Sequence, residues 1–356
     1  MKNSKNERVN WGKTYSVLPP LDLTKIQRDS WEWFKKEGLM EAFREISPID
    51  DFAGKNWQLE FLDYGLGKLY RSVEEAQEKG LSYERPLKIK VKLLNKQTGK
   101  IVEQEVFMGD LPEMTQRGTF IVNGIERCVI SQIVRAPGVY FSGEVDPNTG
   151  RVLHMAEIRP MRGSWLEFFV NRNDIISVRI DRRRKFPVTV LLRAFGLSSD
   201  SDIMSAFSSL SEKDSRFLQK TIEHDATKSK EEALIEIYKK LRPGEPAILD
   251  NAWEFFSNLF LNNRRYELSK VGRYKLNKRL EIDLPNQPGN WILNIKDLIK
   301  ILSYLVNLQE GRGEVDDIDH LANRRVRRVG ELVLFSAIRM GLLRLERMIK
   351  ERMALI

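Results

Sequence analysis

The sequence predicts an α+β fold with more than one domain. The chain has 356 residues, which is enough for two or three separate hydrophobic cores. Strand patterns dominate residues 57–108 and 151–197, where apolar runs are short and glycines interrupt them. Apolar residues at helical spacing dominate residues 198–310 and the last stretch, 329–353. This segregation of strands and helices favours the α+β class.

The clearest strand signal is a hairpin. The apolar run Thr119–Val122 is followed by Asn123-Gly124 and then by a second apolar run, Cys128–Ile130. Asn-Gly between two β-prone runs predicts a tight turn, because both central residues of such a turn need a positive φ. Pro137 and its neighbours then end the strand. Cys128 is the only cysteine, so it excludes an internal disulfide, and we expect a buried, unreactive thiol.

Other elements follow from capping and periodicity. Thr24 and Gln27 fit a capping box at the start of a helix that Gly38 is expected to end. Lysines alternate with apolar residues over residues 87–93, which predicts a strand with its lysines in solvent. No glycine or proline follows the final helix before the chain ends at Ile356, which we take as a sign of truncation.

Composition narrows the function. The formal net charge of +9 favours a polyanionic partner such as nucleic acid. No apolar run approaches the roughly 20 residues that span a bilayer, and residues 1–8 lack the apolar region of a secretory signal, so we expect a cytoplasmic protein without a membrane partner. The three histidines are far apart, and enzyme motifs are missing. Asp316, Asp317 and Asp319 could bind a cation, but a solvated acidic loop is favoured, so we expect no catalytic residue, metal or cofactor in this chain.

Two basic clusters could bind nucleic acid. Residues 182–185 follow a predicted strand, and residues 324–328 precede the last helix. The planar fork of a guanidinium suits phosphate and guanine. A solvated or ion-paired rim explains the charge runs equally well. Asp181 and Asp319 lie close to the clusters in sequence, where they could accept from a base edge or orient an arginine.

The stretch from Met108 to Phe141, with GTFIVNGIER, VISQ and PGVYF, resembles the N-terminal part of bacterial RNA polymerase β subunits. Further stretches extend the resemblance over nearly the whole chain, among them LDLTKIQRDSWEWF, IRPMRGSWLEF, VRIDRRRKFPVTVLLRAFG and DDIDHLANRRVRRVGELV. Residues 1–20 are polar and end in Pro19-Pro20, so we expect a flexible or extended leader there. The resemblance implies two mixed α/β domains after it. A discontinuous protrusion domain would take residues 21–135 and 329–356, and a lobe domain, residues 136–328, would be inserted into it.

The resemblance also implies a DNA site. In the family, a lobe pocket takes a flipped guanine of the non-template strand at the downstream edge of the transcription bubble. The chemistry is coherent, since an indole can stack a base, a carboxylate can accept from guanine, and a guanidinium can bind phosphate. The matching positions are Arg135, Trp165, Asp181, Arg182, Ile318, Asp319 and Arg324.

Two further sites are implied by resemblance alone. Part of the family's rifamycin pocket matches Arg127, Ile130 and Gln132, but the larger part would lie beyond Ile356, so we expect weak drug binding or none. The family's transcription-repair coupling factor grips positions that match Ile101, Val102 and Glu103. Val102 stands where the family usually has a basic residue, which changes that contact.

The resemblance implies a part of the RNA polymerase β subunit. It would form one jaw of the DNA cleft, hold downstream duplex and the non-template strand, and dock transcription factors. Its partners would be DNA, the β′, α and σ subunits and the rest of β, with the catalytic Mg²⁺ on β′. The alternative is a stand-alone β-like module or engineered fragment that serves only as a protein-docking platform. An independent enzyme would need metal-dependent turnover by the isolated chain.

Overall fold

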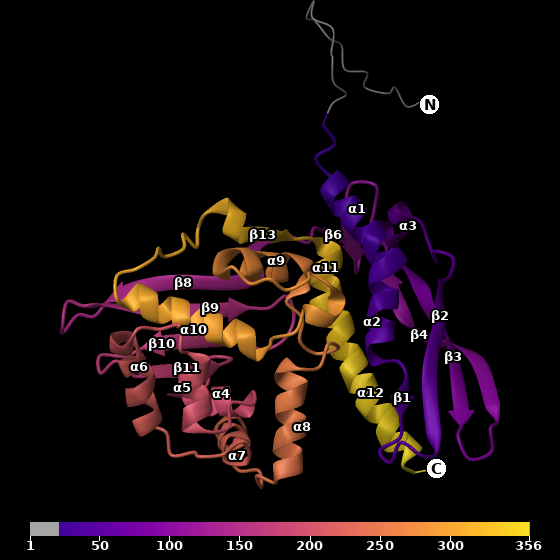
Figure 1. The fold of residues 1–356 in the computed structure, drawn as a ribbon. Coiled ribbons are helices and arrows are strands. Elements are labelled where there is room, and N and C mark those ends of the chain that lie inside the picture. The colour runs from indigo at the N-terminus through magenta and orange to yellow at the C-terminus, as the bar shows by residue number, and fades with distance from the viewer. Residues whose placement is uncertain (1–20, 356) are drawn as a thin grey trace, which may run out of the picture. The chain divides into compact units, whose positions relative to one another are not determined.

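A computed structural model of the chain describes residues 21–355, so the leader predicted at residues 1–20 lies outside the described residues. The chain divides into two compact units (Figure 1). Unit 1 is discontinuous and consists of Met1–Gln132 and Arg327–Ile356, while unit 2 is Ile133–Val326. Both units combine helices with antiparallel sheets, which confirms the predicted α+β class. No helix among residues 21–355 is long and apolar enough to cross a membrane.

The first helix in the described part of unit 1 has three parts: α1 (Lys25–Trp33), the π-helical turn η1 (Phe34–Gly38) and α2 (Leu39–Ile46). The prediction that Gly38 ends a helix is wrong, because its φ of −59° and ψ of −39° continue the helix. The predicted capping box is wrong as well. Thr24 has a helical backbone conformation, and its hydroxyl donates to Asp22 at 2.9 Å instead of capping an amide.

The sheet of unit 1 has four antiparallel strands in the order β1-β2-β3-β4, and α3 (Val73–Glu78) lies between β2 and β3 in the chain. The lysines of β3 are exposed or half-buried, as predicted, and each pairs with a glutamate on a neighbouring strand, for example Lys90 with Glu103 at 2.8 Å. Such pairs make a solvated, neutralised face. The strand bounds are β1 (Ile49–Asp50), β2 (Trp57–Leu66), β3 (Glu84–Asn95) and β4 (Ile101–Pro112).

The predicted Asn-Gly hairpin is confirmed. Asn123 and Gly124 have φ values of 52° and 78°, and they join β5 (Phe120–Val122) to β6 (Ile125–Arg127). The second strand starts immediately after the turn, because a two-residue turn pairs Val122 with Ile125. Cys128 therefore lies past the strand and is exposed, so the prediction of a buried thiol is wrong.

The last helix closes unit 1. It consists of α11 (Val329–Val333), the π-helical turn η4 (Leu334–Ile338) and α12 (Arg339–Met353), in agreement with the predicted helix. Val329 and Leu334 are buried in one core with Trp31 and Phe34. The amide of Gly330 donates to the hydroxyl of Ser30 at 3.0 Å, and a Cβ at Gly330 would lie 2.2 Å from the carbonyl oxygen of Ser30. Glycine is thus required where the two segments of unit 1 pack together.

Unit 2 is built on a five-stranded antiparallel sheet in the order β12-β11-β10-β9-β8, and β7 pairs separately with β13. The strand bounds are β7 (Gln132–Arg135), β8 (Gly138–Val145), β9 (Val152–Arg159), β10 (Leu166–Val170), β11 (Ile176–Ile180), β12 (Phe186–Pro187) and β13 (Arg324–Arg327). The helices are α4 (Val188–Ala194), α5 (Asp200–Ala206), α6 (Glu212–Glu223), α7 (Lys230–Leu241), α8 (Leu249–Phe260), α9 (Ser269–Leu280), α10 (Ile295–Gln309), and the short η2 (Pro288–Asn290) and η3 (Leu321–Asn323).

The two faces of this sheet differ. Alternate residues, such as Ile158, Leu166 and Ile180, are fully buried in a core that they share with the helices of unit 2. The residues between them form a polar row across the sheet, because the strand register places Tyr140, Glu157, Glu167 and Arg179 side by side. The candidate site of unit 2 is assembled from this polar row and the loops that border it.

Candidate nucleic-acid interface

Trp165, Asp181 and Arg182 lie together at one end of the β10–β11 pair. Leu166 pairs with Ile180, so the residues just outside these two positions face each other. The amide of Trp165 donates to Asp181 Oδ1 at 2.8 Å, and the amide of Asp181 donates to the Trp165 carbonyl at 3.1 Å. Asp181 and Arg182 have φ values of 46° and 58°, a left-handed turn that is uncommon outside glycine. The turn is held in place by the tryptophan's own backbone.

The indole ring of Trp165 carries two guanidinium groups. The Arg159 guanidinium carbon lies 3.7 Å from the ring centroid, and that of Arg182 lies 5.3 Å from it. Both distances are within the range of cation–π attraction. Trp165 is half-buried and Arg182 is exposed. Two arginines, one of them exposed, therefore lie against the same indole ring.

Glu157 connects Arg135 to this cluster. Its carboxylate is almost fully buried, with 6% of the side chain exposed. One oxygen pairs with Arg135, and the other forms an ion pair with Arg159 Nη2 at 2.6 Å. Because Arg159 also stacks on Trp165, a continuous set of contacts runs from Arg135 through Glu157 and Arg159 to Trp165 and Arg182. Four of the predicted site residues thus belong to one connected cluster.

The acidic loop before β13 borders strand β8. Asp316 accepts from the amide of Phe141 at 2.8 Å, and its own amide donates to the Phe141 carbonyl at 2.8 Å. Asp319 is paired with Arg324, and its side chain is 84% exposed, while Ile318 is half-buried. Arg324 lies in β13, which pairs with β7, the strand that carries Arg135. Arg324 therefore lies on the strand beside that of Arg135, and Asp319 is joined to Arg324 by their ion pair.

Two titratable groups lie under this loop. Burial raises the pKa of Tyr140 to about 12, so its hydroxyl stays protonated and donates to the Ala136 carbonyl at 2.5 Å. Burial lowers the pKa of Lys275, whose ammonium donates to Asn323 Oδ1 at 2.8 Å and to the Ala322 carbonyl at 3.1 Å. These bonds fix the backbone just before Arg324.

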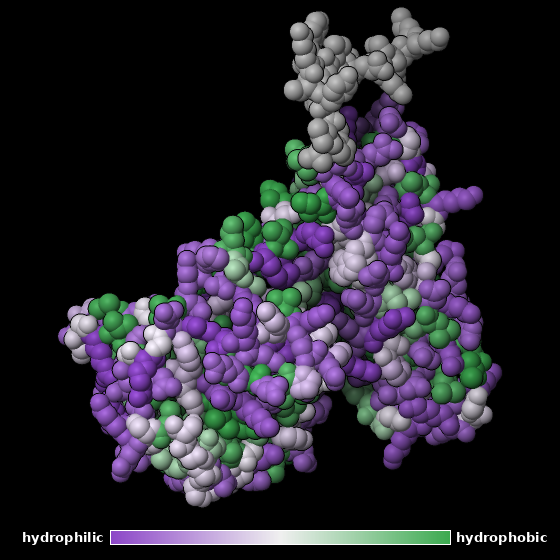
Figure 2. All heavy atoms as spheres, turned by 45° about the horizontal axis from the view of Figure 1, so that its top comes forward, coloured by the Kyte–Doolittle hydropathy of each residue, from purple (hydrophilic) through white to green (hydrophobic). Residues whose placement is uncertain are grey.

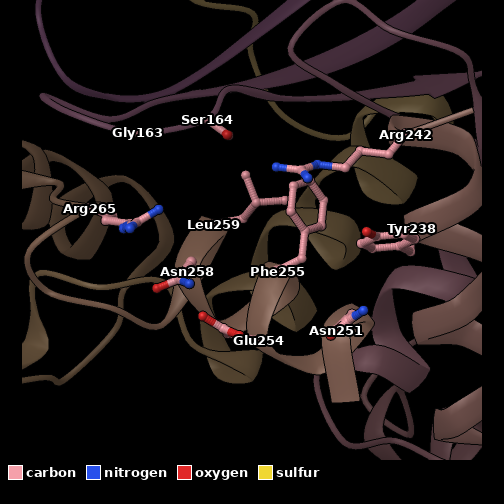
Figure 3. A pocket seen from close by; sticks show the side chains of 10 residues that line it. All are labelled: Gly163, Ser164, Tyr238, Arg242, Asn251, Glu254, Phe255, Asn258, Leu259 and Arg265. Atoms are coloured by element: carbon pink, nitrogen blue, oxygen red, sulfur yellow. The ribbon is translucent and has the colours of Figure 1, made fainter. Parts of the chain in front are cut away.

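A cavity of about 540 Å³ adjoins the Trp165 loop, since Gly163 and Ser164 line it (Figure 3). Arg242 and Arg265 reach it from opposite sides, and the Arg242 guanidinium lies 4.8 Å from the centroid of Phe255. Sequence reasoning missed both arginines, because neither belongs to the basic clusters at residues 182–185 and 324–328 and only the fold brings them to one cavity. It also missed Glu157 and Arg159, for which strand alternation predicts a shared face but no partners.

Asp316, Asp317 and Asp319 make protein contacts. Asp317 accepts from the amide of Asp319 at 2.9 Å, while Asp316 is bonded to Phe141 and pairs with Arg279 at 3.3 Å. Among residues 21–355, no group of three or more histidine, cysteine, aspartate or glutamate side chains is arranged to hold a metal ion.

The other predicted residues lie in unit 1. Arg127, Ile130 and Gln132 are all exposed along one short stretch, and Ile130 is 80% exposed. Ile101 and Val102 are also exposed, at the start of the edge strand β4, while Glu103 pairs with Lys90. Figure 2 shows one face of the molecule, where small groups of hydrophobic side chains are scattered among hydrophilic ones. An exposed edge strand with apolar residues is a surface to which another strand can add.

Comparison with known proteins identifies the class. Residues 135–327, nearly all of unit 2, match the family model described as RNA polymerase Rpb2, domain 2. The DNA-directed RNA polymerase subunit beta of Geobacillus thermodenitrificans (strain NG80-2) is 41% identical over 433 aligned positions, which cover 98% of this chain and 36% of the relative. The corresponding subunit of Chloroflexus aggregans is 46% identical over 377 positions, covering 98% of this chain and 31% of the relative.

These matches confirm the resemblance. The chain belongs to the family of bacterial DNA-directed RNA polymerase β subunits and corresponds to an N-terminal part of them. It spans about a third of the length of the curated relatives that it matches.

Proposed function

We propose that this chain acts in transcription as part of an RNA polymerase, in which unit 2 is the lobe, unit 1 is the protrusion, and the two contribute to one jaw of the DNA cleft. The observation that carries the proposal is the connected cluster of Arg135, Trp165, Asp181 and Arg182 in unit 2. The β-subunit names of the relatives support it. The partners would be β′, α, σ and the rest of β in the cytoplasm, with catalytic Mg²⁺ on β′.

The cluster would bind the displaced non-template strand beside downstream duplex. A base would stack on Trp165, arginines would contact phosphates, and the exposed carboxylate of Asp319 would accept from guanine, with Arg324 holding it. Ile318 would supply an apolar contact from the same loop. Arg242 and Arg265 at the neighbouring cavity would extend the positive surface.

Forked DNA tests this proposal. Affinity should fall steeply with salt, because phosphate contacts release counterions. Trp165→Ala should weaken the free energy of DNA binding by roughly 1–3 kcal/mol, the usual contribution of one stacked base. Trp253→Ala is a matched control, since Trp253 is 42% exposed in unit 2 and carries a lysine 4.6 Å from its ring centroid. If both variants bind forks with and without the guanine as the parent chain does, the DNA site is wrong.

We further propose that the start of β4 docks a transcription-repair coupling factor by strand addition. Support comes from the exposed Ile101 and Val102 on an edge strand. Val102→Lys, which restores the basic residue usual in the family, should tighten binding of that factor, and equal binding by both chains would count against the contact. A pure docking platform would bind the factor but show no salt-dependent affinity for forked DNA.

For rifamycin, we propose that Arg127, Ile130 and Gln132 supply only a fraction of the pocket. Their high exposure is consistent with a surface that needs other residues to enclose a ligand. An equilibrium titration of this chain with the drug should show weak binding or none, and tight saturable binding would refute the idea.

A further inference from the structure

The two arginines on Trp165 are held in different ways. Arg159 has 18% of its side chain exposed and is paired at 2.6 Å with a carboxylate that is itself 6% exposed. Arg182 is exposed, lies farther from the ring and sits on a left-handed turn. A buried ion pair with good geometry is costly to separate, whereas an exposed arginine changes rotamer readily. A ligand that competes for the indole would therefore displace Arg182 and leave Arg159 in place.

We propose that Arg159 is a positioning residue that supports Trp165 for base stacking, and that buried Glu157 holds Arg159 in this role. This inference rests on the proposed function of unit 2 and deepens it. Arg159 stays stacked on the indole at 3.7 Å and fixes the ring plane. The incoming base takes the place of the Arg182 guanidinium, which is then free to bind a phosphate of the same strand.

Glu157 links the support of the Trp165 ring to Arg135. Its two oxygens are divided between Arg159 and Arg135, so one carboxylate orients the indole support and a predicted DNA-binding arginine together. Because a carboxylate with two guanidinium partners fixes both of them, the positions of base and phosphate contacts are set before DNA arrives. Arg159 itself touches no nucleic acid.

The same sheet offers a matched control. Arg179 pairs with Glu167 at 2.9 Å and lies 4.9 Å from the centroid of Phe169. It combines a carboxylate partner and an aromatic ring as Arg159 does, but its carboxylate is Glu167 and its ring is Phe169 rather than Trp165. Arg179→Ala removes the same charge from the same polar face without touching the proposed stacking site.

The test uses the full chain and forked DNA with 2-aminopurine at the displaced base, whose fluorescence falls when the base stacks. Arg159→Ala should weaken binding by about 5- to 20-fold and reduce the quenching, since part of one base's stacking is lost. The slope of log affinity against log salt should not change, because no phosphate contact is removed. Arg159→Lys keeps the charge and the pairing with Glu157 but not the planar group, so it should fail to restore quenching. Arg179→Ala should match the parent chain.

Two results would overturn the inference. One is parental quenching in Arg159→Ala while Trp165→Ala abolishes it, which refutes the support role and leaves the DNA site intact. The other is a salt slope reduced by about one phosphate contact together with full rescue by Arg159→Lys, which makes Arg159 a direct phosphate ligand. If both Arg159→Ala and Trp165→Ala keep the parental quenching, the proposed function itself is refuted. If Arg159→Ala does not fold, the lysine variant decides between the two roles.

Discussion

Replacing Gly330 with alanine tests how the two segments of unit 1 are joined. The new Cβ would lie 2.2 Å from the Ser30 carbonyl oxygen, where real Cβ contacts essentially never fall below 3.0 Å, so α1 and α11 must separate locally. Overpacking of this kind costs about 1–3 kcal/mol. The hydrogen bond from Gly330 to Ser30 would weaken, at a cost of about 1 kcal/mol, and the better helix propensity of alanine returns up to about 1 kcal/mol. The net expectation is a loss of about 1–3 kcal/mol.

Gly341→Ala provides the control on the same terminal helix. No atom lies within 4 Å of the Cβ that this substitution adds, and the position is exposed, so only the gain in helix propensity of up to about 1 kcal/mol remains. Urea unfolding followed by circular dichroism compares the two variants, with the mid-point of unit 1 separated from that of unit 2 where two transitions appear. A Gly330→Ala chain as stable as Gly341→Ala would refute the close approach of α1 and α11.

Two further predictions concern single side chains. The pKa of Asp214 is lowered mainly by its hydrogen bond from the Ser211 hydroxyl and further by Arg312. The stability that this carboxylate contributes is therefore present above its unfolded pKa and is lost as the pH falls through its lower folded pKa. In urea unfolding, Asp214→Asn should destabilise the chain at pH 7 but not at pH 2, and an equal effect at both pH values would contradict the ion pair. Cys128 is exposed, so a thiol reagent should modify the folded chain as fast as the urea-unfolded chain, and strong protection in the folded state would show that the residue is covered.

The sequence predicted the structure correctly where neighbouring residues alone determine the backbone conformation. Asn123-Gly124 specifies a turn with two positive φ values, and the hairpin follows from it. It failed at Gly38, because a glycine does not end a helix where tertiary packing holds the helix together beyond it. Gly38 packs closely here, since a Cβ at this position would contact Trp33 and Leu334. It failed at Cys128 because an apolar run shows neither where strand pairing starts nor whether the run is covered.

For the site as well, the sequence indicated which residues matter but not which residues they contact. The resemblance proposed Trp165, Asp181 and Arg182, and the register of β10 and β11 explains why they meet. Glu157 and Arg159 were not predictable, since alternation along β9 places them on the polar face but cannot show that they pair with each other and with Arg135. The polar face of the sheet is therefore more than a solvated surface. Its charges are paired with neighbours on the same or nearby strands, whereas Arg182, on the turn after β11, is exposed.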